Sequence, residues 1–375
     1  MRTSGSRAKV SAVNLSRRGL PFLVPFTLAL AVAACSSTDA VSSGPEDVRG
    51  APDAAAGDAA PVVEGSLPPL PNTACEALSP RSVPLELHTF PDDGEAPYVD
   101  ALASAKKSIR VMVYMMGFGG ILDTLVAQAR AGVSVQVILD GNEKRGTNQK
   151  YFDALTAAGA TVHWSDPKFS YMHAKVLVVD DALSVISTGN YSKSFLLKER
   201  NYAVTDRDPE DVRTLSALFD ADFVQREPDL SCTRLLVSPV NAKERLVALV
   251  KGAQTEILVE SMQYAYKEVQ DAIAERQRAG VAVRVILADP GWIDANAAAG
   301  TALVAAGISV RQTAEPSIHV KAITVDRKRA YLGSENLSYT SLSKNREIGV
   351  ETEDPALVAK MNATFERDWA GATPF

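Results

Sequence analysis

YMHAKVLVVD, residues 171–180, returns downstream as IHVKAITVD, residues 318–326, and both copies read His-x-Lys-x4-Asp. In the first copy His173 and Lys175 lie two positions apart in a run rich in β-branched residues, and the second copy keeps that spacing. Side chains two positions apart on a strand project from the same face. Each copy is therefore predicted to point one imidazole and one ammonium group into the same space.

The second copy supplies His319 and Lys321, so the chain offers two imidazoles and two ammonium groups to one substrate. That inventory suits attack on a phosphate ester by a histidine nucleophile, and we interpret the chain as an enzyme. The aspartates that close the motif, Asp180 and Asp326, follow their lysines by five positions, on the odd phase of the strand. We include them in the catalytic motif as structural or orienting partners rather than as reacting groups.

The repeat extends through the rest of the chain. A glycine turn that leads into an apolar strand at residues 131–139 returns at residues 279–287, and Asp222 in the closing helix of the first half matches Asp368 in the second. Alternating helices and strands with short glycine turns predict a mostly parallel sheet flanked by helices. We therefore expect two similar α/β lobes, related by a pseudo-two-fold, with the active site between them and the two motif histidines side by side.

A further polar loop follows each histidine at the same distance. Asn190 and Asn336 each stand seventeen positions after a motif histidine, with Ser192 and Ser338 two positions further on. We expect these four side chains to bind the phosphate oxygens of the substrate. Glycine and asparagine also form turns in any protein, which is the simpler alternative. The matched spacing favours phosphate binding more for the asparagines than for the serines.

The doubled motif, with the Gly, Ser and Asn residues that trail it, resembles the phospholipase D superfamily. The resemblance covers residues 85–369 and is closer to the bacterial phospholipase and cardiolipin synthase-like members than to the long eukaryotic ones. It implies a two-lobed α/β fold, a phosphohistidine intermediate, phosphodiester substrates, and neither a metal ion nor another cofactor.

The two halves differ at one position that the family uses. Family members commonly carry an acidic residue 28 positions after each histidine, which orients its ring; here Glu347 follows His319, but Asn201 follows His173. A carboxylate favours the imidazolium, whereas an amide orients the ring with less effect on its pKa. On this basis we expect His173 to be the nucleophile and His319 the general acid. Glu199 is an alternative source of the missing carboxylate.

The first 35 residues have the pattern of an export signal, with a basic region, an apolar core and small residues before a cysteine. The segment that ends at Cys35 resembles the lipobox of bacterial lipoproteins, so we expect Cys35 to be lipidated, with ordinary signal cleavage as the alternative. Residues 36–74, rich in Ala, Pro, Ser, Gly and Asp, are predicted to be a disordered tether. The expected location is the cell envelope, as a lipoprotein of the outer membrane that faces the periplasm or the exterior.

The predicted lobes comprise residues 75–228 and 229–375. With Cys35 assigned to lipid, Cys75 and Cys232 remain, and an exported compartment permits a disulfide between them. The alternative is two unrelated thiols. No spacing of Cys and His predicts a metal site.

The charge of the chain bears on its substrate. The formal net charge is −6, and removing the five positive charges of residues 1–35 leaves about −11 for the remainder, which disfavours non-specific nucleic-acid binding. The leading hypothesis is a phospholipase D-type hydrolase that releases phosphatidate and a free alcohol from a glycerophospholipid. The alternatives are a transphosphatidylase of the cardiolipin synthase type, a metal-independent nuclease-type phosphodiesterase, and a non-enzymatic binding protein. We expect a monomer with no deducible protein partner.

Overall fold

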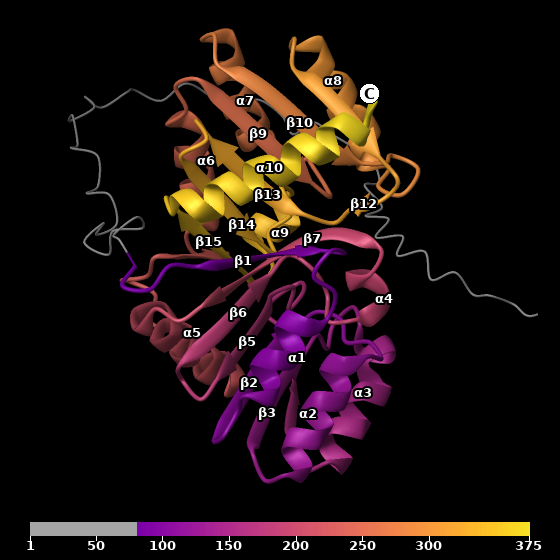
Figure 1. Ribbon diagram of the computed structural model, residues 1–375, viewed down its shortest axis with the longest axis vertical. Helices are drawn as coiled ribbons and strands as arrows, with labels where there is room; N and C mark the ends of the chain where they lie inside the picture. The colour runs from indigo at the N-terminus through magenta and orange to yellow at the C-terminus, as the bar shows by residue number, and fades with distance from the viewer. Residues whose placement is uncertain (1–80) are drawn as a thin grey trace, which may run out of the picture. The chain divides into compact units, whose positions relative to one another are not determined.

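The computed structural model describes residues 81–375. The predicted signal segment and tether, with Cys35 and Cys75, lie outside the described residues. Two lobes follow one another along the described chain, each built on a sheet with helices beside it (Figure 1). The predicted boundary after residue 228 falls in the connection between the last helix of the first lobe and the first strand of the second.

The first lobe contains seven strands that form one continuous path in the order β1-β7-β6-β5-β2-β3-β4. Its elements are β1 (Glu86–Phe90), α1 (Ala96–Ala103), β2 (Ser108–Val113), α2 (Gly120–Arg130), β3 (Ser134–Leu139), α3 (Arg145–Ala157), β4 (Thr161–Trp164), β5 (Lys175–Val179), β6 (Leu183–Ser187), α4 (Lys193–Leu196), β7 (Glu199–Asp206) and α5 (Pro209–Phe223).

The second lobe repeats this plan in the order β16-β11-β10-β9-β13-β14-β15-β8. Its elements are β8 (Leu235–Ser238), α6 (Ala242–Lys251), β9 (Glu256–Ser261), α7 (Lys267–Arg278), β10 (Ala282–Ala288), α8 (Ala295–Ala305), β11 (Ser309–Thr313), β12 (Ser317–Ile318), β13 (Lys321–Val325), β14 (Arg329–Gly333), α9 (Tyr339–Ser343), β15 (Glu347–Thr352), α10 (Pro355–Gly371) and β16 (Thr373–Pro374).

The structure confirms two similar α/β lobes, but the sheets are mixed rather than mostly parallel. In the first lobe only β2, β3 and β4 pair in parallel, whereas β5, β6, β7 and β1 add antiparallel strands. The reason is the length of the connections. The early strands are joined through helices, but β5 returns into β6 through a short turn at residues 180–182, which permits only antiparallel pairing.

Strand alternation divides the side chains between separate cores. In β2, Val111 and Val113 pack in the core of the first lobe with α1, α2 and α3, whereas Met112 faces the opposite way. Met112 belongs to a core that contains residues of both lobes, including Phe219 of α5 and Phe365 of α10. The closing helices α5 and α10 thus lie in a layer that the two sheets share.

Two buried ion pairs connect the lobes through those closing helices. Arg200 of β7 in the first lobe binds Asp368 of α10 through both carboxylate oxygens, at 2.5 and 2.9 Å. Arg346, which precedes β15 in the second lobe, contacts Asp222 of α5 at 2.8 and 3.0 Å. The repeat therefore places each arginine against the closing helix of the other lobe.

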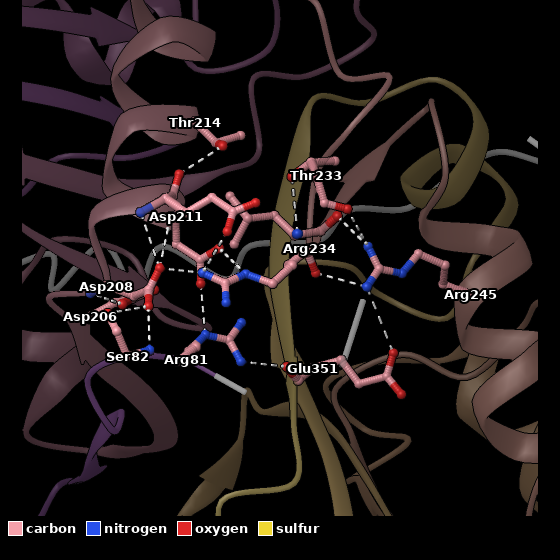
Figure 2. Close-up of polar contacts among 12 residues, drawn as sticks. Arg81, Ser82, Asp206, Asp208, Asp211, Thr214, Thr233, Arg234, Arg245 and Glu351 are labelled. Atoms are coloured by element: carbon pink, nitrogen blue, oxygen red, sulfur yellow. Dashed lines mark hydrogen bonds and ion pairs between the residues drawn. The ribbon is translucent and has the colours of Figure 1, made fainter. Parts of the chain in front are cut away.

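A second ionic network lies where the first lobe leads into the second (Figure 2). Arg81 and Arg234 bind the two carboxylate oxygens of Asp211 at 2.7 and 3.0 Å, and Arg234 also donates to Asp208. Arg81 donates further to the backbone oxygen of Glu351 in β15, at 3.0 Å. Cys232, in the connection just before Arg234, is disulfide-bonded, while its predicted partner lies outside the described residues.

Candidate active site

Both motif strands lie in the middle of their sheets. Lys175 begins β5 and Lys321 begins β13, and all five residues of each strand are buried. Each strand is flanked on both sides by antiparallel neighbours, so its position along the sheet is fixed by two ladders of hydrogen bonds. The two histidines stand two residues before these strands, where the chain leaves the sheet.

Each histidine is held by the backbone of the other lobe. Arg346 accepts backbone hydrogen bonds from His173 and Ala174, both at 2.9 Å, and Arg200 accepts one from His319 at 3.1 Å. These contacts come from short parallel pairings, Met172 with Arg346 and β12 with β7. The sites of both motifs are therefore completed across the interface between the lobes.

The imidazole partners are exchanged relative to the sequence-based expectation. His173 Nδ1 lies 2.8 Å from Glu347 Oε2, and His319 Nδ1 lies 3.0 Å from Asn201 Oδ1. The expected pairs, Glu347 with His319 and Asn201 with His173, are wrong. The cross-lobe pairing explains the exchange, because each histidine contacts the strand of the opposite lobe. The premise from which we assigned the nucleophile is therefore also wrong.

Burial and nearby lysines lower the proton affinity of both histidines. Burial lowers the pKa of His173, while the charge of Glu347 opposes part of that decrease. Burial, followed by the charges of Lys321, Lys175 and His173, lowers the pKa of His319 well below 6.5. Burial acts to raise the pKa of Glu347, but His173 and Lys175 hold it below its usual value. These mutual effects agree with two imidazoles and two ammonium groups sharing one site.

The two lysines are completely buried and are fixed by local contacts. Lys175 Nζ donates to the backbone oxygen of His173 and lies 5.3 Å from the ring centroid of Tyr114. Lys321 Nζ donates to the backbone oxygen of His319 at 2.7 Å and lies 3.6 Å from the sulfur of Met262. The lysines thus provide positive charge beside the imidazoles in a region with little water to screen it.

Sequence reasoning gave the aromatic residues of this site no catalytic part. Tyr114 meets His173 edge to face with ring centroids 4.7 Å apart, and Trp292 stacks with His319 at 6.2 Å. The repeat offered a signal for Tyr114, because it stands 148 positions before Met262 and both flank a motif lysine.

The asparagines of the trailing loops retain unused hydrogen-bonding capacity. The side-chain oxygens of Asn190 and Asn336 are buried and have no hydrogen-bond partner among the described residues. An amide oxygen only accepts hydrogen bonds, so a phosphate would have to be bound by the amide nitrogens instead. Phosphate binding through these amides stays a prediction.

The serines of the same loops have local contacts. Ser338 caps α9 by accepting a hydrogen bond from the backbone nitrogen of Ser341 at 3.4 Å. Ser192 Oγ lies 2.9 Å from Ser194 Oγ. Ser192 also packs closely on Gly117. A Cβ added to Gly117 would lie 2.4 Å from the Cβ of Ser192. These contacts support structural roles for the serines more directly than phosphate binding.

Asp180 and Asp326 lie at the ends of the motif strands that are remote from the lysines. Asp180 accepts hydrogen bonds from the backbone nitrogens of Lys106, Lys107 and Ser108, at 2.7, 2.7 and 2.8 Å. Asp326 accepts equivalent bonds from residues 254–256. Five residues of strand span about 16 Å, so neither carboxylate can reach a substrate held at the lysines. Both aspartates therefore have a structural role within the motif, as their phase on the strand predicts, and are not reacting groups.

Another buried carboxyl group, Glu335, lies close to the site. The Tyr331 hydroxyl donates to Glu335 at 2.6 Å, and burial, with the charge of Glu347, raises the pKa of Glu335 to about 8. The repeat did not predict this acidic residue, because the equivalent position in the first lobe is Gly189. Glu335 contacts neither histidine in the hydrogen bonds of the described chain, and we regard it as a neutral structural group.

Residues 81–375 show neither a metal-binding cluster nor a membrane-spanning helix. No group of three or more His, Cys, Asp or Glu side chains is placed there to hold a metal ion. No helix within those residues combines the length and apolar character required to cross a membrane.

Comparison with known proteins agrees with this geometry. The sequence pattern of the family described as "Cardiolipin synthase, PLD-like domain" matches residues 98–223 and again residues 246–369. The minor cardiolipin synthase ClsB of Bacillus subtilis is 23% identical over 304 residues, which cover 71% of this chain and 76% of that protein. Cardiolipin synthase B of Escherichia coli K12 is 25% identical over 279 residues, which cover 61% of this chain and 66% of that protein.

Solved structures show the same fold at lower identity. Phosphatidylserine synthase of Haemophilus influenzae aligns with a TM-score of 0.62 at 15% identity, over 78% of this chain and 87% of that chain. Polyphosphate kinase of Porphyromonas gingivalis aligns with the same TM-score at 18% identity, over 76% of this chain and 47% of that chain. Because the family pattern covers both lobes and two thirds of the sequence, the chain belongs to the Cardiolipin synthase, PLD-like domain family of the phospholipase D superfamily.

Proposed function

We propose that this protein transfers phosphatidyl groups between alcohols, as a transphosphatidylase of the cardiolipin synthase type, through a phosphohistidine intermediate. The observation that carries the proposal is the pair of buried imidazoles beside two buried lysines, with each ring fixed through Nδ1 by a residue of the other lobe. A ring held through Nδ1 presents Nε2 as its reacting atom. The similarity to cardiolipin synthases favours transfer over hydrolysis to phosphatidate, which shares the same intermediate.

His173 is the proposed nucleophile, for a reason that replaces the sequence-based one. Attack of His173 Nε2 on phosphorus gives the ring a positive charge, which it keeps as long as the phosphorus–nitrogen bond lasts. Glu347, 2.8 Å from Nδ1 and with a lowered pKa, supplies a carboxylate that offsets this charge. His319 Nδ1 contacts the Asn201 amide at 3.0 Å and the Lys321 ammonium at 3.2 Å, neither of which offsets a positive charge on the ring, so His319 is suited to give up a proton.

The remaining steps balance protons around His319. As the bond from phosphorus to the leaving oxygen breaks, protonated His319 gives its proton to that alcohol. The acceptor alcohol then gives its proton to His319 and attacks phosphorus, which releases His173. The lysines and the amides of Asn190 and Asn336 hold the non-bridging oxygens. A bound phosphodiester anion also offsets the lysine charges that lower the pKa of His319.

We further propose that the substrate is met at the membrane of the cell envelope, through a lipid on Cys35. The support is the sequence of residues 1–35, and the long polar tether that follows would let the folded lobes reach the lipid surface.

The test is to incubate the purified protein, in the presence of a chelator, with phosphatidylglycerol, phosphatidylcholine or single-stranded DNA. Conversion of phosphatidylglycerol to cardiolipin and glycerol is the expected result, and the His173→Asn variant should be inactive. Release of phosphatidate instead would select hydrolysis. Cleavage of DNA alone would overturn the lipid proposal, and no conversion of any substrate would contradict the enzymatic one.

A further inference from the structure

The two residues that surround each cross-lobe arginine stand in opposite order in the two lobes. The first lobe reads Glu199-Arg200-Asn201, and the second reads Asn345-Arg346-Glu347, 146 positions on. Both lobes therefore hold one carboxylate and one amide at this place. In the second lobe the carboxylate contacts a histidine and Asn345 stands behind it, donating to Glu347 at 2.9 Å.

The first lobe has the reverse arrangement. Asn201 contacts His319, and Glu199 stands behind it, accepting from the Asn201 amide nitrogen at 3.2 Å. The nearest oxygen of Glu199 lies 3.9 Å from His319 Nδ1, with only 12% of the Glu199 side chain exposed. The first lobe thus also has a carboxylate near its histidine partner, but the Asn201 amide lies between Glu199 and His319.

The orientation of the Asn201 amide is set by a chain of donors. The backbone nitrogen of Tyr202 donates to Thr188 Oγ1, and the hydroxyl of Thr188 donates to Asn201 Oδ1, both at 2.9 Å. The amide nitrogen must then point to Glu199. Asn201 Oδ1 can only accept, so its contact with His319 Nδ1 favours a hydrogen on that nitrogen, while the Lys321 ammonium, 3.2 Å from the same nitrogen, favours the opposite. The other nitrogen, Nε2, is left for proton exchange with substrate.

Charged groups from several elements face this pair. Glu199 lies at the start of β7, where the positive charges of Lys321 on β13 and Lys175 on β5 act to lower its pKa. His319, which follows β12, faces both lysines and His173. Lys175, Lys321 and His173 all carry a positive charge when protonated, so none of them can stabilise an imidazolium at His319. Glu199 is therefore the carboxylate best placed to support an imidazolium at His319.

We propose that Glu199 is a positioning residue that acts through Asn201 to keep His319 able to hold the proton it gives to the leaving alcohol. The proposal rests on the phosphatidyl-transfer chemistry set out above. Placing an amide between the carboxylate and the ring gives His319 weaker support than His173 has, so the proton is bound and yet readily released. The transposed order thereby separates the roles of two histidines that otherwise share one motif.

The test compares two leaving groups on the same phosphatidyl donor in single-turnover experiments. Glycerol departs from phosphatidylglycerol only with a proton, whereas p-nitrophenolate departs from phosphatidyl-p-nitrophenol without one. In Glu199→Gln the pKa that His319 has in the substrate complex, where the bound phosphodiester offsets the lysine charges, falls, so the protonated acid is lost at lower pH. In the pH profile of glycerol release, the decline at high pH should move to lower pH by about one unit. The rate of the p-nitrophenolate burst should change by less than about twofold.

The pH at which the effect appears is also predicted. Burial raises the pKa of Glu199 to about 7, and the Asn201 hydrogen bond and the two lysines reduce that increase. Below that pH Glu199 is protonated and resembles glutamine, so wild type and Glu199→Gln should converge. Above it they should diverge, to about a tenfold difference in glycerol release. Glu86→Gln, which removes an exposed carboxylate from neighbouring β1, is the matched control and should follow wild type.

A second variant keeps the proposal falsifiable if the first folds poorly. The transposed variant Glu199→Asn/Asn201→Glu puts a carboxylate in contact with His319 and should move the alkaline limb to higher pH, while Glu199→Asp should retain most of the wild-type profile. Equal loss with both leaving groups, or an alkaline limb that neither change moves, would overturn the role of Glu199. Failure of the wild-type protein to release either group would instead overturn the proposed function.

Discussion

A single transposition of residue types gives the two motif histidines different environments. Their own motifs are equivalent, and both rings are buried among the same lysines. What differs is whether a carboxylate or an amide contacts Nδ1. At this scale the sequence contained the right residues, since Glu347, Asn201 and Glu199 were all identified. It could not show which ring each one meets, because proximity along the chain suggested partners within a lobe.

The contact between Glu347 and His173 leads to a prediction about the first chemical step. Glu347→Gln removes the charge that offsets the cationic ring, and should slow formation of the phosphoenzyme by about 10²- to 10⁴-fold. Rapid quenching followed by mapping of the phosphorylated peptide would measure both its rate and its position, which should be His173. Label on His319 would contradict the assigned roles.

Glu335 provides the matched control for that experiment. Its pKa of about 8 keeps the buried carboxyl group protonated at neutral pH, so Glu335→Gln exchanges one neutral group for another of similar size. Phosphoenzyme formation in this variant should remain within about tenfold of wild type. A loss as large as that of Glu347→Gln would mean that any change in this buried polar cluster disrupts the site, and would remove the evidence for a charge effect.

At the scale of elements, the sequence predicted what local patterning controls. The glycine turns before Ser134 and Ala282, the β-branched runs of β5 and β13, and the closing helices α5 and α10 all correspond to the structure. Strand direction in the second half of each lobe was not predicted. The signal was present in the short connection between β5 and β6, which leaves no room for a crossover, but the helix-strand alternation of the earlier segment dominated the interpretation.

The turn after each motif strand gives a prediction about the motif aspartates. Asp326 adopts a φ of 54° and accepts three backbone hydrogen bonds from residues 254–256, as well as one from the Thr255 hydroxyl. Asp326→Ala loses these acceptors and places alanine in a left-handed conformation, so unfolding free energy should fall by about 2–4 kcal/mol. Urea unfolding would measure this loss. The rate of glycerol release by the folded fraction should stay close to wild type.

Asp326→Asn separates hydrogen bonding from strain in the same turn, because asparagine tolerates the left-handed conformation and keeps one acceptor. It should therefore cost less than the alanine variant. The pKa of Asp326 lies below its usual value despite the opposing effect of burial, because backbone donors favour the charged form. Its stabilising contribution is present above the unfolded pKa of a carboxyl group and is lost as the pH falls through the lower folded value. The difference between wild type and Asp326→Asn should accordingly shrink in acid.

At the scale of the whole molecule, the lobes are parts of one structure rather than two tethered domains. They share a hydrophobic core that includes both closing helices, and the active-site partners of each histidine come from the opposite lobe. Neither lobe could present an oriented imidazole alone. We therefore expect unfolding of the described body to be cooperative, since separating the lobes exposes that core and uncovers two buried arginines.

The two cross-lobe ion pairs are equivalent in the repeat, yet they should differ in energetic importance. Arg346 and Asp222 are each 1% exposed, and the position equivalent to Glu260 beside this pair holds Met112. Asp222→Asn removes the buried carboxylate that pairs with Arg346 and should lower the unfolding free energy by about 3–5 kcal/mol. Asp368→Asn should cost less, because Asp92 lies 3.7 Å from Arg200 and Glu260 is close enough to Arg200 for their charges to interact.

Glu260 can compensate for the loss of Asp368 only if it loses its proton and becomes a carboxylate. Burial and the charge of Asp368 raise the pKa of Glu260 to about 8, so Glu260 is mostly protonated at neutral pH in the wild-type protein. Removing the Asp368 charge lowers that pKa and lets Glu260 ionise beside Arg200, which limits the loss. Urea unfolding at pH 7 should therefore rank Asp222→Asn as the more destabilising variant. Adding Glu260→Gln to Asp368→Asn should increase its cost, although Asp92 remains 3.7 Å from Arg200 in both variants. An unchanged stability on adding Glu260→Gln would exclude Glu260 as the substitute.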